Sequence, residues 1–231
     1  MAKAASTSKI SRAVVRMYCM GTGDCFVIKF FRGTQQKPSF TMMIDCGVWS
    51  GEKAHLKKYM TNLVDYVSDR GVDLLVITHE HKDHVHVFEA CKELFVSPGF
   101  TVKKIWMGWS ENDAVSKVKK WKTQYGEKKM SLALAAEKLE ALINDPKEQQ
   151  QILGAQNGMS ILAAKKNFAA ALSNFKDLHV QGANGVYKGA LEGMRIVKKE
   201  IANDNIEYFS PGDIVDDVPG LDGVRFYVLG P

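Results

Sequence analysis

A short apolar strand that runs directly into a cluster of metal-binding residue types constrains the fold of this chain most. The run DLLVIT (73–78) is short and continuously apolar, which is typical of a strand buried on both faces. It is followed at once by His79, His81, Asp83 and His84. His79 and His81 are two residues apart, so on an extended backbone both imidazoles project to the same side and can share one ion. Asp83 and His84 come where the chain turns into a helix and can bind a second ion, so the pattern predicts a two-metal site.

The position of this motif predicts its chemistry. Loops at the carboxyl ends of central strands usually carry the functional residues of layered folds. A bound metal ion lowers the pKa of water towards about 7, so hydroxide becomes available at neutral pH, and a metal pair can stabilise the attacking and leaving oxygens. We therefore expect a hydrolase, with Asp83 as its candidate catalytic residue. The alternative is a polar surface loop that contains these residues without binding metal.

The other histidines are weaker candidates for metal ligands. His86 lies two residues beyond His84, so on a helix it faces nearly the opposite way and is expected to be exposed or packed. His55 stands beside two lysines on an amphipathic helix, which is typical of a surface residue. His179 follows a helical run and is either a distant ligand or an ordinary edge-strand histidine.

Strand and helix patterns alternate along the rest of the chain. Strand patterns are expected at 13–20, 25–31, 40–45, 73–78, 103–109, 205–210 and 223–231. Apolar residues at helical spacing predict helices over 55–67 and from Asp83 onward. Residues 110–200 are rich in Lys, Ala and Gln with Leu at helical intervals, which predicts a helical insertion. We expect a flexible tail over 1–12 and one domain over 13–231.

Composition excludes several classes of protein. Apolar residues make up 45% and charged residues 25%, so neither a disordered chain nor a fibrous repeat fits. No segment approaches the roughly 20 consecutive apolar residues of a membrane span, and the N-terminal residues lack the apolar region of a signal peptide. The four cysteines form no CxxC pair and are interpreted as reduced, buried thiols, with a disulfide framework or a zinc knuckle as the alternative. These features predict a cytoplasmic protein with no membrane partner.

The positive charge of the chain is concentrated in one stretch. Residues 101–130 hold eight lysines against three acidic residues. Lys117, Lys120 and Lys122 are candidate contacts to nucleic acid, since lysines that neutralise phosphates give affinity independent of sequence. Trp121 and Tyr125 lie among them and could stack on bases. The alternative is a solvated helix face, which is the more common meaning of such a charge run.

At the motif itself, the chain resembles the metallo-β-lactamase superfamily. Its metal motif HxHxDH is matched by His79, His81, Asp83 and His84, and the segments MGTGDCFVI (20–28) and MIDCG (43–47) resemble strand pairs of the branch related to the hydrolase domain of competence-type DNA-uptake proteins. The resemblance covers residues 13–109 and 205–231. It implies an α+β fold of the αββα sandwich type and two divalent ions, with zinc most often in the site and Mn or Fe as alternatives.

The resemblance also assigns two further residues and a substrate class. Asp24 and Asp45 fall where family members support the metal loop from the second coordination shell, and capping of turns by short carboxylates is the alternative. The DNA-uptake branch implies a phosphodiester substrate in nucleic acid. A small thioester, lactam or phosphorylated metabolite as substrate, or a non-catalytic metal-binding interaction module, stays open.

A final expectation concerns the extent of the fold. All of the expected strands belong to the first half of an αββα sandwich, and no residue after His84 offers the later metal ligands of the family convincingly. We therefore expect only the N-terminal half of the sandwich, with a protein partner or a C-terminal half completing the sheet.

Overall fold

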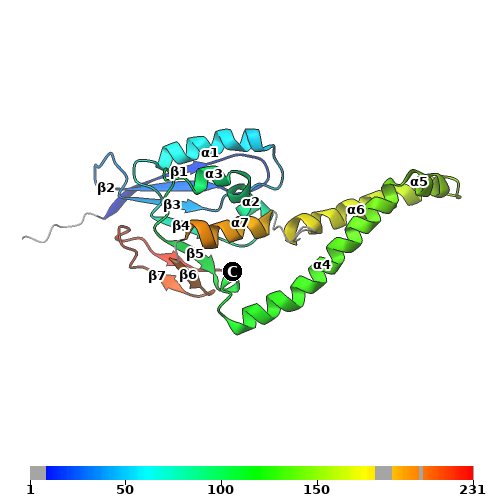
Figure 1. The fold of residues 1–231 in the computed structure, drawn as a ribbon. Coiled ribbons are helices and arrows are strands. Elements are labelled where there is room, and N and C mark those ends of the chain that lie inside the picture. The colour runs from blue at the N-terminus through cyan, green and yellow to red at the C-terminus, as the bar shows by residue number, and fades with distance from the viewer. Residues whose placement is uncertain (1–8, 180–188, 203–204, 231) are drawn as a thin grey trace, which may run out of the picture. The chain divides into compact units, whose positions relative to one another are not determined.

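A six-stranded mixed sheet forms the centre of the larger of two units in the chain. The computed structural model describes residues 9–179, 189–202 and 205–230, whose elements are drawn in Figure 1. The sheet unit comprises Met1–Asp113 and Glu192–Pro231, and the helical unit comprises Ala114–Leu191. The fold class is α+β, as predicted, and is consistent with the metallo-β-lactamase-like fold that the resemblance implies.

The strands of the sheet follow one another in chain order. They are β1 (Ile10–Met17), β2 (Phe26–Arg32), β3 (Phe40–Ile44), β4 (Leu74–Ile77), β5 (Ile105–Gly108) and β6 (Ile206–Phe209). Strands β1 to β3 pair antiparallel, whereas β3 to β6 pair in parallel. Because β2 runs opposite to β3 and β4, the beginning of β2 lies at the same edge as the ends of β3 and β4. The candidate metal-binding residues all lie at that edge.

Helices cover one face of the sheet (Figure 1). They are α1 (Lys53–Val67), α2 (Lys82–Ala90), α3 (Lys92–Phe95) and α7 (Ala190–Ile196). Lys29 of β2 donates a hydrogen bond to the carbonyl of Tyr66 in α1 at 2.6 Å. A side chain at Gly193 of α7 would overlap the backbone of Val85 in α2, so the glycine permits close packing of the two helices.

One face of α1 forms a buried stripe. Leu56, Met60, Leu63 and Val67 are buried, which is the four-three-four spacing of one helix face. Tyr59, which also fits a helical spacing, lies beside this stripe and contacts the ring of His55, with the centroids 5.0 Å apart.

The opposite face of the sheet packs on the segment that follows β6. Its core residues are Phe30, Phe40, Met42, Leu74, Trp106 and Leu221. The expected strand at 223–231 is reduced to β8 (Phe226–Tyr227), which pairs with β7 (Ile214–Val215) and not with the main sheet. Trp106 belongs to this core and donates a hydrogen bond to Glu207 at 2.9 Å, so it is structural.

The first strand begins earlier than the sequence pattern indicates. β1 starts at Ile10, within the expected tail, because Ile10 packs against the apolar cluster on the second face of the sheet. β1 is also an edge strand of the main sheet, and Val15 and Met17 are exposed on it. Completion of the sheet by a partner remains a prediction.

The described part of the helical unit contains the helices α4 (Ser116–Asn144), α5 (Pro146–Leu153) and α6 (Gly158–His179). A small core of Ile143 and Leu162 packs with Leu139 and Ile152. Asp145 caps α5 by accepting a hydrogen bond from the Lys147 N–H at 2.8 Å. Among the described residues of 110–200 the regular elements are helical, as the sequence predicts. No helix in the described part of the chain is long and apolar enough to cross a membrane.

A buried carboxylate ties the start of β4 to its neighbours. Asp73 accepts hydrogen bonds from the Thr41 N–H at 2.8 Å and from Arg70 and Lys103 at 2.6 Å each. Burial opposes ionisation of Asp73, but these donors outweigh it and lower the pKa of the carboxyl group.

We expect Asp73→Asn to lower the free energy of unfolding by about 1–3 kcal/mol at pH 7, because buried donors lose a charged partner. A lowered pKa gives stability that is present above the unfolded-state pKa and lost as the pH falls through the folded-state pKa. In urea unfolding, the free energies of unfolding of the variant and the wild type should therefore become equal as the pH is lowered into the acid range. Asp69→Asn is the control, since its ion pair with Lys29 is exposed on the aspartate side and should matter by less than about 1 kcal/mol.

Candidate metal centre

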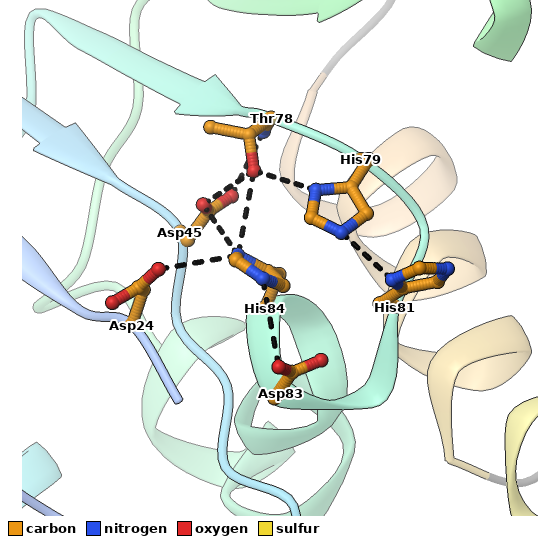
Figure 2. Close-up of polar contacts among 7 residues, drawn as sticks. All are labelled: Asp24, Asp45, Thr78, His79, His81, Asp83 and His84. Atoms are coloured by element: carbon orange, nitrogen blue, oxygen red, sulfur yellow. Dashed lines mark hydrogen bonds and ion pairs between the residues drawn. The ribbon is translucent and has the colours of Figure 1, made fainter. Parts of the chain in front are cut away.

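Three strand ends bring the candidate ligands together at one edge of the sheet. Asp24 lies just before β2, Asp45 just after β3, and the segment from Thr78 to His84 follows β4. Figure 2 shows their side chains pointing toward one another. His79 and His81 stand on the extended segment, whereas Asp83 and His84 belong to the first turn of α2, which begins at Lys82.

A buried network orients His84. Asp45 is only 1% exposed, and its carboxylate accepts hydrogen bonds from the N–H and the hydroxyl of Thr78 at 2.8 and 2.6 Å. His84 Nδ1 lies 2.9 Å from Asp45 Oδ2. Because a carboxylate only accepts, this contact assigns the proton of His84 to Nδ1 and leaves Nε2 as a metal-binding lone pair.

The hydroxyl of Thr78 also contacts His79, which in turn contacts His81. His79 Nδ1 lies 3.0 Å from Thr78 Oγ1, and His79 Nε2 lies 2.8 Å from His81 Nδ1. Two nitrogens bound to one tetrahedral zinc ion at about 2.0 Å would be roughly 3.3 Å apart. The two imidazoles therefore need only a small adjustment to share an ion.

Carboxylates complete the donor set. Asp83 Oδ2 lies 3.7 Å from His84 Nε2, and Asp24 Oδ2 lies 3.7 Å from His84 Nδ1. One ligand atom from each of Asp24, Asp45 and His84 lies within 4.8 Å of the other two. Imidazole nitrogens and carboxylate oxygens gathered at this range fit a divalent transition-metal ion. We call the set of Asp24, Asp45, His79, His81, Asp83 and His84 the metal centre.

Comparison with known proteins identifies the family. The family model described as "Metallo-beta-lactamase superfamily" matches residues 21–162, a span that includes the HxHxDH motif. The chain belongs to the metallo-β-lactamase superfamily. The match runs past Trp109 into the helical unit, beyond the part of the chain in which the resemblance was seen from sequence. No curated protein and no solved structure matched the chain.

Membership of the metallo-β-lactamase superfamily indicates a hydrolase that binds divalent metal ions. The electrostatics of the centre suit that role. Burial lowers the pKa of His79, and the positive charges that His84 and His81 can carry lower it further, so His79 is neutral and ready to bind metal. The hydrogen bond to Asp45 raises the pKa of His84 against the opposing effect of burial. A proton on His84 therefore competes with a metal ion.

This competition predicts how metal binding depends on pH. We expect metal affinity to fall as the pH is lowered through the raised pKa of His84, because imidazolium offers no lone pair. His79 has a lowered pKa and stays neutral through that range. In Asp45→Asn the hydrogen bond that raises the pKa is weakened, so the midpoint of the loss should move to lower pH. Competition with a chromophoric chelator between pH 5 and 8 measures this midpoint in the wild type and in Asp45→Asn. The control is Asp65→Asn, which changes an exposed carboxylate and should leave the midpoint unchanged. An unchanged midpoint in Asp45→Asn would contradict the assignment.

Sequence reasoning missed the residues that hold the metal loop in place. The sequence pattern places Thr78 only at the end of a strand, and it predicts no role for the side-chain-free position Gly47. A side chain at Gly47 would overlap the backbone of Asp83 and His84, so β3 and α2 approach closely there. Asp45 has a φ of 52°, a conformation uncommon outside glycine. The sequence signal was the MIDCG segment itself, where glycine follows a short carboxylate by two residues.

Two other histidines of the sheet unit do not join the metal centre, and the candidate lysines belong to the helical unit. His55 is exposed on α1, and His86 is half-buried with Nε2 4.0 Å from a Glu89 oxygen. The side chain of His179 lies outside the described residues. Lys117 and Lys120 are exposed and Lys122 is half-buried, all on α4 of the helical unit.

Proposed function

We propose that this chain is a metal-dependent hydrolase that cleaves phosphodiester bonds in nucleic acid, with two divalent ions at the metal centre and zinc as the first choice. The observation that carries the proposal is the convergence of the HxHxDH side chains with Asp24 and Asp45 at one edge of the sheet. Family membership supports hydrolysis. The resemblance of MGTGDCFVI and MIDCG to the DNA-uptake branch supports the phosphodiester.

The side chains divide into two ligand sets. His79 and His81 would hold one ion through Nε2 and Nδ1, the two atoms that lie 2.8 Å apart. Asp83 and His84 would hold the other through Oδ2 and Nε2, which lie 3.7 Å apart. A divalent ion at this position lowers the pKa of a bound water and neutralises charge on a phosphate.

The carboxylates have separate tasks. Asp45 is buried and keeps His84 in the tautomer and orientation that exposes Nε2. Asp83 is partly exposed, so its second oxygen can accept the proton of an attacking water. Three carboxylates at one edge would repel a phosphodiester in the absence of cations. The phosphodiester proposal therefore requires that metal ions be bound.

Two other substrates or roles would use the same centre. A small thioester, lactam or phosphorylated metabolite needs the same activated water, and a metal-binding interaction module needs no turnover at all. The lysines of α4 favour a polyanion over these alternatives, since they give the chain a run of positive charge that can neutralise phosphates.

The test combines metal analysis with a substrate panel. Purified protein is analysed for Zn, Mn and Fe by mass spectrometry and then assayed on single-stranded DNA, a generic phosphodiester and a thioester. We expect about two metal ions per chain and hydrolysis of the phosphodiesters, both reduced in Asp83→Ala. Turnover confined to the thioester would overturn the substrate, and bound metal without turnover on any substrate would favour the interaction module.

A further inference from the structure

The first turns of α4 form a basic face with exposed aromatic rings. From Ala114 to Gly126 the chain contains four lysines and no acidic residue. Trp121 is 51% exposed and Tyr125 is 44% exposed. The two rings are four residues apart on the helix, with centroids 5.6 Å apart and planes at 65°. Side chains at this spacing share one face, so the two rings are neighbours on one exposed side of α4.

The lysines here differ from those that stabilise the sheet. Lys103 and Lys104 are paired with Asp73 and Glu207 at 2.6 and 2.7 Å. By contrast, Lys117, Lys119 and Lys120 are exposed and form no ion pair with any residue that the structure describes. Charges that do not serve the fold are available to a partner.

A shallow hollow on the same helix has Lys120 and Gln124 on the side nearer the two rings. It has a volume of about 610 Å³ and is lined by Ser116, Lys119, Lys120, Thr123 and Gln124. Thr123 donates its hydroxyl hydrogen to the carbonyl of Lys119 at 2.9 Å. Among the residues that the structure describes, the two ammonium groups, the Ser116 hydroxyl and the Gln124 amide have no side-chain partner. A lining rich in donors and without a carboxylate suits a phosphate.

We propose that this face of α4 binds single-stranded nucleic acid, with phosphates at Lys117 and at the Lys120 and Gln124 side of the hollow, and with unpaired bases stacked on Trp121 and Tyr125. We call Lys117, Lys120, Trp121, Gln124 and Tyr125 the α4 strip. Lys122 is half-buried on the same side as the buried Val118, so it is not part of the strip. The proposal rests on the proposed function for the class of substrate, and it narrows that class to single strands.

The chemistry favours this partner over other polyanions. Each base offers a π face to an aromatic ring, and stacking is tolerant of sequence. In a duplex the bases are stacked on each other, so a duplex could use the lysines but not the rings. An acidic peptide would likewise pair with the lysines and leave both rings in water. Two large aromatic side chains exposed together are better explained by a partner that covers them.

The test is a binding titration in EDTA, so that it does not depend on metal or turnover. Fluorescence anisotropy of a labelled 15-nucleotide oligo(dT) is compared with a duplex of equal length and with poly-glutamate. We expect Trp121→Ala to weaken oligo(dT) binding by about tenfold and Trp121→Phe to restore most of it, because stacking needs only the ring. The matched control is Phe168→Ala, which removes an exposed ring from α6.

The contribution of the lysines is measured separately, from the salt dependence of oligo(dT) binding. Each phosphate contact contributes about −0.7 to the slope of log K against log salt for a single strand. We therefore expect Lys117→Ala/Lys120→Ala to reduce the magnitude of the slope by roughly 1.4, and the exposed Lys165→Ala/Lys166→Ala on α6 to leave it unchanged. Circular dichroism confirms that each variant is helical.

Equal binding of duplex or poly-glutamate, or tight oligo(dT) binding that Trp121→Ala leaves unchanged, would overturn the α4 strip as a single-strand site. Its failure is separable from that of the proposed function. Oligo(dT) binding without hydrolysis by the metal-loaded protein would overturn the function alone. Phosphodiester hydrolysis without strip-dependent binding would overturn the inference alone.

Discussion

The double variant His79→Ala/His81→Ala is expected to reduce the proposed phosphodiester hydrolysis by at least about 100-fold, since even the replacement of residues that only orient ligands reduces activity by about 10- to 100-fold. The variant removes both nitrogens that lie 2.8 Å apart at the end of β4. His81 is exposed and His79 half-buried, so the loss of packing is small. We expect the fold to be retained.

The measurement pairs activity with metal content in the same preparation. His55→Ala is the matched control, because it removes an exposed imidazole from α1 that contacts only a neighbouring tyrosine ring among the described contacts. Wild-type metal content and activity in the double variant would show that the pair does not bind metal. Loss of both with an unchanged thermal midpoint is the expected outcome.

The variant Gly47→Ala is expected to disable the centre without touching a ligand. A methyl group at this position would overlap the backbone of Asp83 and His84, so the first turn of α2 must shift away from β3. The shift would break the hydrogen bond from the Cys46 N–H to the His84 carbonyl, now 2.7 Å long. We expect a loss of about 1–3 kcal/mol in the free energy of unfolding, as for other overpacked sites, together with loss of metal binding.

The control for this prediction is Gly99→Ala. The nearest atom that a side chain at Gly99 would meet is 3.7 Å away, which is an ordinary contact, so its stability and metal content should match the wild type. Thermal unfolding and metal titration of both variants test the claim. A Gly47→Ala protein that keeps full metal affinity would show that the position of α2 is not set by this contact.

Some of the metal centre could be predicted from sequence because its parts are local. His79, His81, Asp83 and His84 lie within six residues, and their directions follow from an extended segment that becomes a helix at Lys82. The continuous apolar run of β4 and the helical stripe of α1 are equally local. For that reason the strand, the loop and the helix could be placed within a few residues.

The lysine-rich stretch shows the limit of prediction from local sequence patterns. Lys103 and Lys104 share the charge run with Lys117 and Lys120 in sequence, yet the first two form ion pairs with Asp73 and Glu207. Lys104 and Glu207 are 103 residues apart, and they meet only because β5 pairs with β6. No pattern within the run distinguishes structural lysines from those available to a partner.

The sequence by itself determined the ligand types, their spacing, the α+β class and the helical character of the region after β5. Only the tertiary structure decided that Asp45 is buried against His84, that Thr78 connects it to His79, and that Gly47 supports the loop. Asp45 and His84 are 39 residues apart, and their contact depends on the parallel register of β3 with β4. The physical reason is that side-chain direction follows from local backbone period, whereas contact across a sheet follows from pairing and packing, which distant residues fix together.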